Sequence, residues 1–169
     1  MLKRIFTVIA VLMLASCSAG AVSTEEVSAA YQSDFSCGLV ISCGEDKTEM
    51  KCTKNGLSIM LSTISPEDMA GLDMEISGGR LKLSFEGMET EFDFENLPEN
   101  GPVGLFCRLL DTLALPDEFE VSRNGKKITL VGKGFSAELD GENFGLLSAR
   151  FPEENTEFTF SDWEFSGEK

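Results

Sequence analysis

The sequence contains no histidine, and this absence restricts its chemistry more than any other feature of its composition. Histidine is the usual general base of active sites and the commonest protein ligand of transition metals. Without it, neither a Ser-His-Asp nor a Cys-His nucleophile system can be built. Carboxylate pairs such as Glu89/Glu91 and Glu153/Glu154 occur, but 29 acidic residues produce such pairs by chance. We therefore expect no catalytic residues and a protein that is not an enzyme.

Basic residues are also scarce. The chain has 14 Lys and Arg against 29 Asp and Glu, a formal net charge of −15. Such a chain has too few cations to neutralise the phosphates of a nucleic acid. It also lacks the clusters of Lys and Arg that hold a protein flat on anionic lipid. The charge excludes nucleic acid as a partner and predicts a soluble, self-repelling body, which we expect to be a monomer.

Motifs for metals, redox chemistry and repeats are missing as well. The five cysteines form no CxxC pair, so a zinc ribbon or a thioredoxin-like site is not expected. We expect neither a metal nor a cofactor. The chain has no internal repeat, no low-complexity tract and no linker that would divide it, so one domain is predicted.

The first 16 residues have the features of a secretory signal. Lys3 and Arg4 are followed by an apolar run over residues 5–14, which is too short for a membrane span of ~20 residues. The run ends in Leu14-Ala15-Ser16-Cys17, which resembles the lipobox of bacterial lipoproteins. This resemblance implies cleavage before Cys17 and attachment of diacylglycerol to its thiol. The alternative is an ordinary signal peptide followed by a chance cysteine.

The lipobox determines the expected domain boundaries and location. Two or more acyl chains hold a protein firmly on a membrane, since each buried methylene contributes ~0.8 kcal/mol. We predict a signal peptide over residues 1–16, a flexible tether over 17–22 and one domain over 23–169. The protein is then exported and anchored through Cys17 to the outside of the cell membrane, or to the outer membrane where the cell has two.

Most of the domain has the pattern of antiparallel strands. Ser23 and Glu26 form a capping box before a short helix over residues 24–32. Asn55-Gly56 and Asn124-Gly125 are strong hairpin motifs. Alternating apolar residues between turn residues predict strands over 35–43, 48–54, 57–64, 73–77, 80–85, 88–94, 119–123, 126–131, 135–139, 144–151 and 156–165.

The last of these strands changes face along its length. Phe158 and Phe160 stand at even positions and therefore on one face of the strand, whereas Trp163 and Phe165 stand at odd positions and on the other face. Either a bulge near Ser161-Asp162 or burial on both faces explains the switch.

One longer helix interrupts the strands over residues 102–114. Its apolar stripe consists of Val103, Phe106, Cys107, Leu110 and Leu113, widened by Leu105 and Leu109. A helix apolar on more than one side must be buried. The predicted fold is α+β and mainly antiparallel β. It is a curved, open half-barrel of about 9–11 strands, with this helix packed in the concave face and a short helix at the N-terminus.

This order of elements behind a lipobox resembles the lipoprotein-localisation family, which has the LolA/LolB-like fold. Family members are open, strongly curved half-barrels whose concave apolar face is plugged by helices. The resemblance covers about residues 23–165 in layout, and the segment over residues 65–72 resembles a loop of small members. It implies a carrier of lipid-like molecules, and no functional residue of the family is transferred to this chain.

The resemblance also implies a water-poor cavity between the sheet and the main helix. Candidate lining residues are Leu39, Ile41, Met50, Leu57, Ile59, Leu83, Phe92, Phe94, Phe106 and Leu110. Protein interiors are close-packed, so the alternative is that these side chains only fill the core. The sequence thus predicts a lipoprotein that binds or carries a lipid-like apolar ligand. The alternative is a non-enzymatic structural or interaction lipoprotein with a packed core and no ligand.

Four cysteines remain after the predicted cleavage, and their positions place them on the inward faces: Cys37, Cys43, Cys52 and Cys107. If the first hairpin centres on Glu45-Asp46, Cys52 lies opposite Leu39 and diagonal to Cys37, which is marginal for a disulfide. We predict buried, unbridged thiols, with a Cys37–Cys52 disulfide as the alternative.

Overall fold

The computed structural model describes residues 22–166. The predicted signal peptide, Cys17 and the tether up to residue 21 lie outside the described residues. The described part contains the α-helices α2 (Thr24–Gln32) and α3 (Pro102–Leu113) and the short 3₁₀ helices η1 (Glu67–Met69) and η2 (Phe94–Asn96). Both predicted helices are confirmed.

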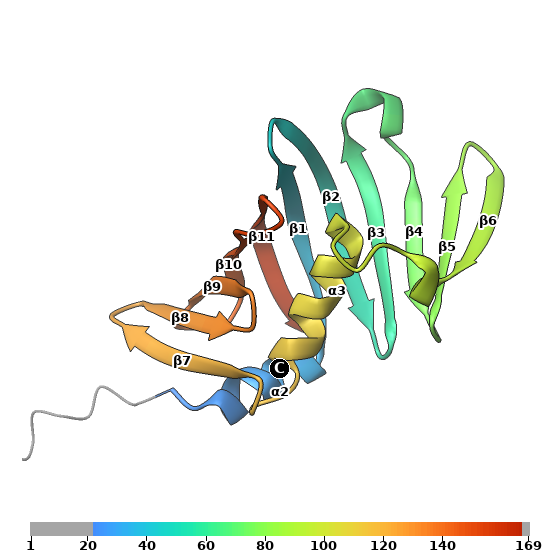
Figure 1. The fold of residues 1–169 in the computed structure, drawn as a ribbon. Coiled ribbons are helices and arrows are strands. Elements are labelled where there is room, and N and C mark those ends of the chain that lie inside the picture. Colours follow the sequence, from blue (N-terminus) through green and yellow to red (C-terminus); the bar gives the residue numbers. More distant parts are fainter. Residues whose placement is uncertain (1–21, 167–169) are drawn as a thin grey trace, which may run out of the picture.

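The strands form one open, curved, antiparallel sheet of 11 strands (Figure 1). In space their order is β6-β5-β4-β3-β2-β1-β11-β10-β9-β8-β7. The sheet therefore consists of two meanders that meet where the first strand pairs with the last. The predicted fold class is confirmed. The strands are β1 (Asp34–Cys43), β2 (Asp46–Asn55), β3 (Ser58–Ser65), β4 (Asp73–Ser77), β5 (Arg80–Phe85), β6 (Met88–Asp93), β7 (Phe119–Asn124), β8 (Lys127–Gly132), β9 (Phe135–Asp140), β10 (Leu146–Phe151) and β11 (Thr156–Ser166).

Both Asn-Gly hairpins are present. Gly56 and Gly125 adopt positive φ angles of 58° and 64° in the turns that join β2 to β3 and β7 to β8. In the first of these turns Asn55 pairs with Ser58, so Leu57 belongs to the turn and is 94% exposed. The prediction that Leu57 starts a strand and points inward is wrong.

The hairpin between β1 and β2 turns one residue earlier than predicted. Cys43 pairs with Asp46 around Gly44, whose φ of 62° suits glycine. This register places Cys37 directly opposite Cys52, so the predicted diagonal offset of these two cysteines is wrong.

Helix α2 begins with the predicted capping box. The Ser23 amide donates to the Glu26 carboxylate at 3.0 Å, and the Glu26 amide donates to the Ser23 hydroxyl at 3.2 Å. Val27 and Tyr31 are buried, and the Tyr31 hydroxyl donates to the carbonyl oxygen of Phe144 at 2.7 Å. The short helix is thereby tied to the connection between β9 and β10.

A bulge interrupts the pairing of β11 with β1. The register shifts between Ser36 and Gly38 of β1, and Asp162 of β11 has a φ of 50°. The predicted bulge is confirmed. It lets the Trp163 ring join an aromatic cluster with Tyr31, Phe35, Phe160 and Phe165.

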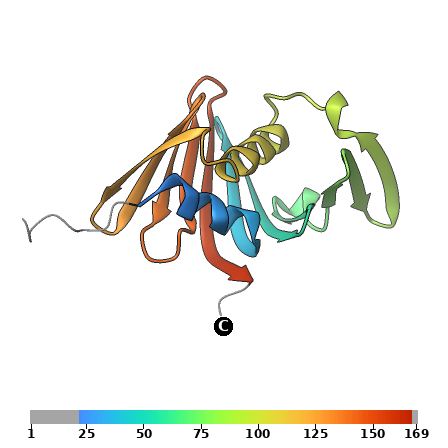
Figure 2. The same cartoon turned by 90° about the horizontal axis from the view of Figure 1, so that it is seen from below.

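Helix α3 lies in the concave face of the sheet (Figure 1 and Figure 2). Leu105, Leu109 and Leu113 are fully buried. The ring of Phe106 lies 6.0 Å and 6.3 Å, between centroids, from Phe158 and Phe160 of β11. We call α2, α3, β1, β2 and β7–β11 the body.

Strands β4, β5 and β6 extend beyond α3 (Figure 2), and we call them the wing. Every residue of β6 is exposed, and Phe92 is 45% exposed. On the outer face, Lys82 pairs with Glu89 at 2.8 Å and Arg80 pairs with Glu91. The predicted strands are thus present in the wing, but their side chains are much less buried than those of the body.

Candidate functional site

A hollow of about 320 Å³ lies between the sheet and the first residues of α3. We call it the sheet–helix hollow. Its walls come from β1–β4 and their connections, including η1, and from the start of α3. The residues that line it are Ile41, Cys43, Asp46, Thr48, Met50, Thr63, Met69, Leu72, Met74, Pro102 and Val103.

The wall of the hollow is largely apolar and rich in sulfur, with Cys43 beside Met50, Met69 and Met74. Methionine is unbranched and polarisable, so a wall of methionines adapts to flexible apolar molecules. Met50 is 1% exposed whereas Met69 is 40% exposed, so the hollow runs from the interior to the surface. Its volume lies at the lower end of small-molecule sites, which span roughly 300–1,000 Å³.

One polar group in the wall has an unused hydrogen-bonding capacity. Thr63 is 4% exposed, and its Oγ1 has no hydrogen-bond partner among the described residues. Leaving a buried hydroxyl unpaired costs roughly 1–3 kcal/mol, and an acceptor or donor atom of a bound molecule would remove that cost. Asp46 also lines the hollow, is exposed, and makes no ion pair within residues 22–166.

The structure does not bring the ten candidate lining residues together. Ile41 and Met50 line the sheet–helix hollow. Leu39, Phe106 and Leu110 are instead buried in the core.

The other five candidates lie in the wing or near it. Ile59 and Leu83 are half-buried on β3 and β5. Leu57 is exposed in its turn and Phe92 is largely exposed on β6. Phe94 begins η2 instead of ending a strand, and it lines a different groove.

Sequence reasoning missed several residues of the hollow. Thr63 and Met74 share the inward parity of Leu61 and Ile76, so the same alternation could have identified them. Met69 and Leu72 lie in the connection between β3 and β4, where no periodicity applies. Their approach to the sheet depends on backbone hydrogen bonds from the Thr63 amide to the Leu72 carbonyl and from the Gly71 amide to the Thr63 carbonyl, both 2.9 Å.

The cysteines outside the predicted lipobox are free thiols. Cys37, Cys52 and Cys107 are buried, and Cys43 is half-buried. A hydrogen bond to Cys37 and burial raise the pKa of Cys52, and burial raises the pKa of Cys107 to about 12. The thiols of Cys52 and Cys107 are therefore protonated at neutral pH and are poor nucleophiles.

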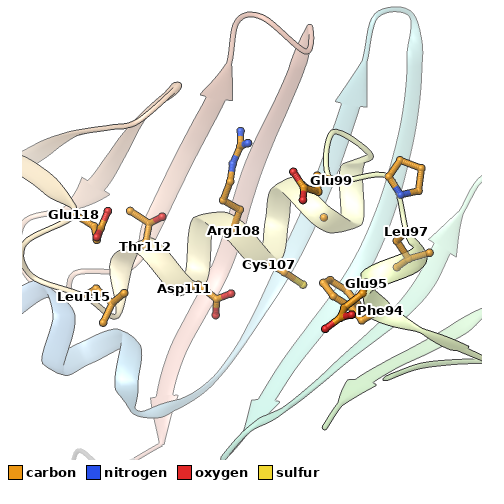
Figure 3. A pocket seen from close by; sticks show the side chains of 12 residues that line it. Phe94, Glu95, Leu97, Glu99, Cys107, Arg108, Asp111, Thr112, Leu115 and Glu118 are labelled. Carbon is orange, nitrogen blue, oxygen red and sulfur yellow. The ribbon is translucent and has the colours of Figure 1, made fainter. Parts of the chain in front are cut away.

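A second, larger depression of about 660 Å³ lies against the outer side of α3 (Figure 3). We call it the α3 groove. It is bounded by α3, by the segment Phe94–Glu99 and by Glu118. A Cβ at Gly104 would lie 2.9 Å from the carbonyl oxygen of Glu99, so the absence of a side chain there lets this segment pack closely on the helix.

Within residues 22–166, no group of three or more His, Cys, Asp or Glu side chains is arranged to hold a metal ion. None of the helices in this part of the chain is long and apolar enough to cross a membrane.

The chain is similar to solved structures at low sequence identity. No protein-family model matches the sequence, and no curated protein is significantly similar to it.

An uncharacterized conserved protein from Thermus thermophilus is 8% identical with a TM-score of 0.55, over 85% of each chain. A LolA superfamily protein from Nitrosomonas europaea is 10% identical, with 88% of this chain and 96% of that chain covered and a TM-score of 0.43. The lipoprotein LppX from Mycobacterium tuberculosis is 11% identical, with coverage of 83% and 91% and a TM-score of 0.46. The chain thus shares a fold with the Thermus protein, and its more distant structural neighbours include a LolA superfamily protein and a lipoprotein.

Proposed function

We propose that this protein is an exported lipoprotein, held on the cell envelope through lipidated Cys17, that binds or carries a lipid-like apolar ligand in the sheet–helix hollow. The observation that supports a ligand is the apolar, methionine-lined hollow with the unpartnered hydroxyl of Thr63 in its wall. The basic residues, apolar run and Leu-Ala-Ser-Cys segment of residues 3–17 support the anchor. The function requires binding alone, and no catalytic step is proposed.

The lining of the hollow favours an apolar chain with a neutral polar group. The methionine side chains contact the apolar chain, and an ester, amide or hydroxyl group hydrogen bonds to Thr63. A free carboxylate is disfavoured because the carboxylate of Asp46 lies at the same hollow and has no cation to neutralise it within residues 22–166. The proposed ligand class is therefore acyl esters, amides or long-chain alcohols.

Mass spectrometry of an organic extract tests this proposal. Residues 18–169 are purified without detergent, and the extract is expected to contain an acyl lipid. Met74→Trp fills the hollow and should reduce the recovered lipid several-fold. Met60→Trp is the matched control, because Met60 lies on the neighbouring strand, next to the pairing partner of Met74, and does not line the hollow. Lipid that is absent from the wild-type extract, or that is retained equally by both variants, contradicts the proposal.

A second variant tests the role of Thr63. Thr63→Val keeps the shape of the side chain and removes the hydroxyl. Ligand affinity should fall by roughly 2- to 10-fold, the equivalent of one hydrogen bond. The ligand-free protein should be as stable as the wild type or more stable, because an unpaired buried hydroxyl has been removed. Unchanged affinity would show that the ligand does not reach Thr63.

A specific observation favours the alternative function, an interaction lipoprotein with a packed core. Between α3 and the sheet, Leu39, Phe106 and Leu110 are each at most 5% exposed and belong to one hydrophobic cluster. The part of the concave face that α3 covers is therefore filled by side chains. The extract decides between the two functions, since the packed protein contains no lipid.

The anchor is tested separately with the full chain. Cys17→Ala should release the protein from the membrane or leave it uncleaved, because the thiol that accepts the lipid is missing. Detergent partitioning of cells labelled with a radioactive fatty acid measures this. A Cys17→Ala protein that still partitions as a lipid-modified species contradicts the anchor.

A further inference from the structure

The α3 groove is a second surface whose chemistry differs from that of the sheet–helix hollow. The two share no lining residue. The groove runs along α3 from Gly104 to Thr112, about 12 Å at 1.5 Å per residue, and continues to Leu115 beyond the end of the helix. Its position on the outer side of the helix makes it accessible without any movement of the fold (Figure 3).

The floor of the groove is apolar. Leu115, two residues past the end of α3, is 53% exposed at one end of the groove, and the half-buried Phe94 and Leu97 lie at the other end (Figure 3). Cys107 completes the floor in the middle of the helix. The backbone of Pro98 and Glu99 packs closely on α3 at Gly104, which holds this end of the wall against the helix.

The rim of the groove is acidic and lacks an available cation. Its four carboxylates are Glu95, Glu99, Asp111 and Glu118. None of the four makes an ion pair within residues 22–166.

The single basic residue of the lining, Arg108, is already engaged. Its guanidinium pairs with Glu154 at 3.3 Å and lies over the Phe151 ring at 5.0 Å. The negative field of the four carboxylates is therefore left for another molecule to neutralise. Burial also raises the pKa of Asp111, and a bound cation would oppose that shift.

We propose that the α3 groove is a docking site for a basic amphipathic helix of a protein partner. Apolar side chains of that helix contact Phe94, Leu97 and Leu115, and its Lys or Arg side chains pair with the four carboxylates. An apolar floor inside a charged rim is the arrangement by which helix-in-groove sites bind amphipathic helices of opposite charge. The proposal does not depend on the sheet–helix hollow holding a ligand.

Titration of a fluorescent peptide into the protein tests this site. The probe is a 14-residue helix with Leu at i, i+3 and i+4 spacing and Lys elsewhere, and the same peptide with Gln for Lys is its control. Binding of the Lys peptide to residues 18–169, followed by anisotropy, should weaken as salt is added. Equal binding of the Gln peptide overturns the proposal.

Two charge variants separate the groove from the overall acidity of the protein. The groove variant combines Glu95→Gln, Glu99→Gln, Asp111→Asn and Glu118→Gln, and should weaken binding at least about tenfold, because four ion pairs are lost. The control variant has the same net charge and combines Glu45→Gln, Glu67→Gln, Glu120→Gln and Glu153→Gln, all exposed and unpaired within residues 22–166. It should change binding less than about twofold. Equal weakening by both variants would show a bulk charge effect and overturn the proposal.

The apolar contact has its own pair of variants. Leu115→Ser should weaken peptide binding several-fold, whereas Leu57→Ser, at a more exposed leucine outside the groove, should leave it unchanged. Both changes are at exposed positions, so both proteins should fold. Unchanged binding by Leu115→Ser would show that the peptide does not occupy the groove and would overturn the proposal.

Discussion

The body and the wing belong to one continuous sheet and share the same alternation of apolar and polar residues, but their burial differs. In the body, Phe151 and Phe158 are fully buried. In the wing, Phe92 is 45% exposed although it stands in an alternating pattern like theirs. The burial differs because α3 covers the concave face of the body and does not extend over the wing (Figure 2). Alternation therefore predicts which face points inward, but not whether anything covers that face.

The comparison also explains where the two depressions lie. The sheet–helix hollow lies where the start of α3 meets β3 and β4, and the α3 groove lies where α3 meets the segment that leaves the wing. Both are at the boundary between covered and uncovered sheet. Regions with few buried contacts open at low free energy, so we expect the wing to open more readily than the body, which would suit uptake of the proposed ligand at this boundary.

The largest predicted difference follows from placing a charge on each region. Leu110→Glu puts an unpaired carboxylate at a position that is 5% exposed in the body, and should cost several kcal/mol of unfolding free energy. Glu91→Lys in the wing removes an exposed ion pair with Arg80 and should shift stability little. The urea midpoints of both variants measure this. Equal shifts would show that the wing is packed as tightly as the body.

Matched truncation of phenylalanine sharpens the comparison. Phe158→Ala in the body should cost about 3–5 kcal/mol, because it leaves a cavity among the rings of Phe106 and Phe151. Phe92→Ala in the wing should cost less than about 1 kcal/mol, because the ring is already half in solvent. Chemical denaturation with both variants gives the two values. A cost for Phe92→Ala near that of Phe158→Ala would contradict the division into body and wing.

A smaller effect is predicted at the cap of α2. Ser23→Ala should lower stability by about 1 kcal/mol, since the Glu26 amide loses its acceptor. Glu26→Gln is the control and should behave almost as the wild type, because glutamine also completes a capping box. Thermal unfolding of both variants checks this. If Ser23→Ala leaves the transition unchanged, α2 is not part of the cooperative unit formed by the body.

The last prediction involves no change in stability. In the folded form of residues 18–169, the buried thiols of Cys37, Cys52 and Cys107 should resist alkylation at pH 8, and half-buried Cys43 should react first. At pH 8 Cys107 is almost wholly protonated, because burial raises its pKa to about 12. Mass measurement after alkylation of the denatured, unreduced protein should show four modified cysteines. Only two would indicate a disulfide between the directly opposed Cys37 and Cys52.

Local chemistry was sufficient to predict the elements of the fold. Ser23 and Glu26 begin α2, Pro102 begins α3, and Gly56 and Gly125 turn their hairpins. Each of these residues acts on its immediate neighbours, so no knowledge of the tertiary structure is needed to interpret it.

The candidate site was predicted only in part. Ile41 and Met50 reach the sheet–helix hollow, whereas Leu39 and Phe106 meet other side chains. Leu39, Ile41 and Met50 share the inward parity of β1 and β2, and Phe106 lies on the apolar stripe of α3, so the residue pattern does not distinguish the residues that line the hollow. How far the helix extends over each strand depends on the curvature of the sheet, which residue spacing does not encode. A one-residue error at a turn was enough to misplace Leu57.

The seam between β1 and β11 has a consequence for the order of folding. Within each meander, neighbouring strands are joined by short connections and can pair as soon as they are made. The seam instead joins distant parts of the chain, since Cys43 and Thr156 meet across a separation of 113 residues, and closing so long a loop is slow. Because β11 lies in the middle of the sheet, the two halves cannot join until the residues of β11 are available. The two meanders therefore stay unjoined until β11 has been made or translocated, which suits the export that we propose.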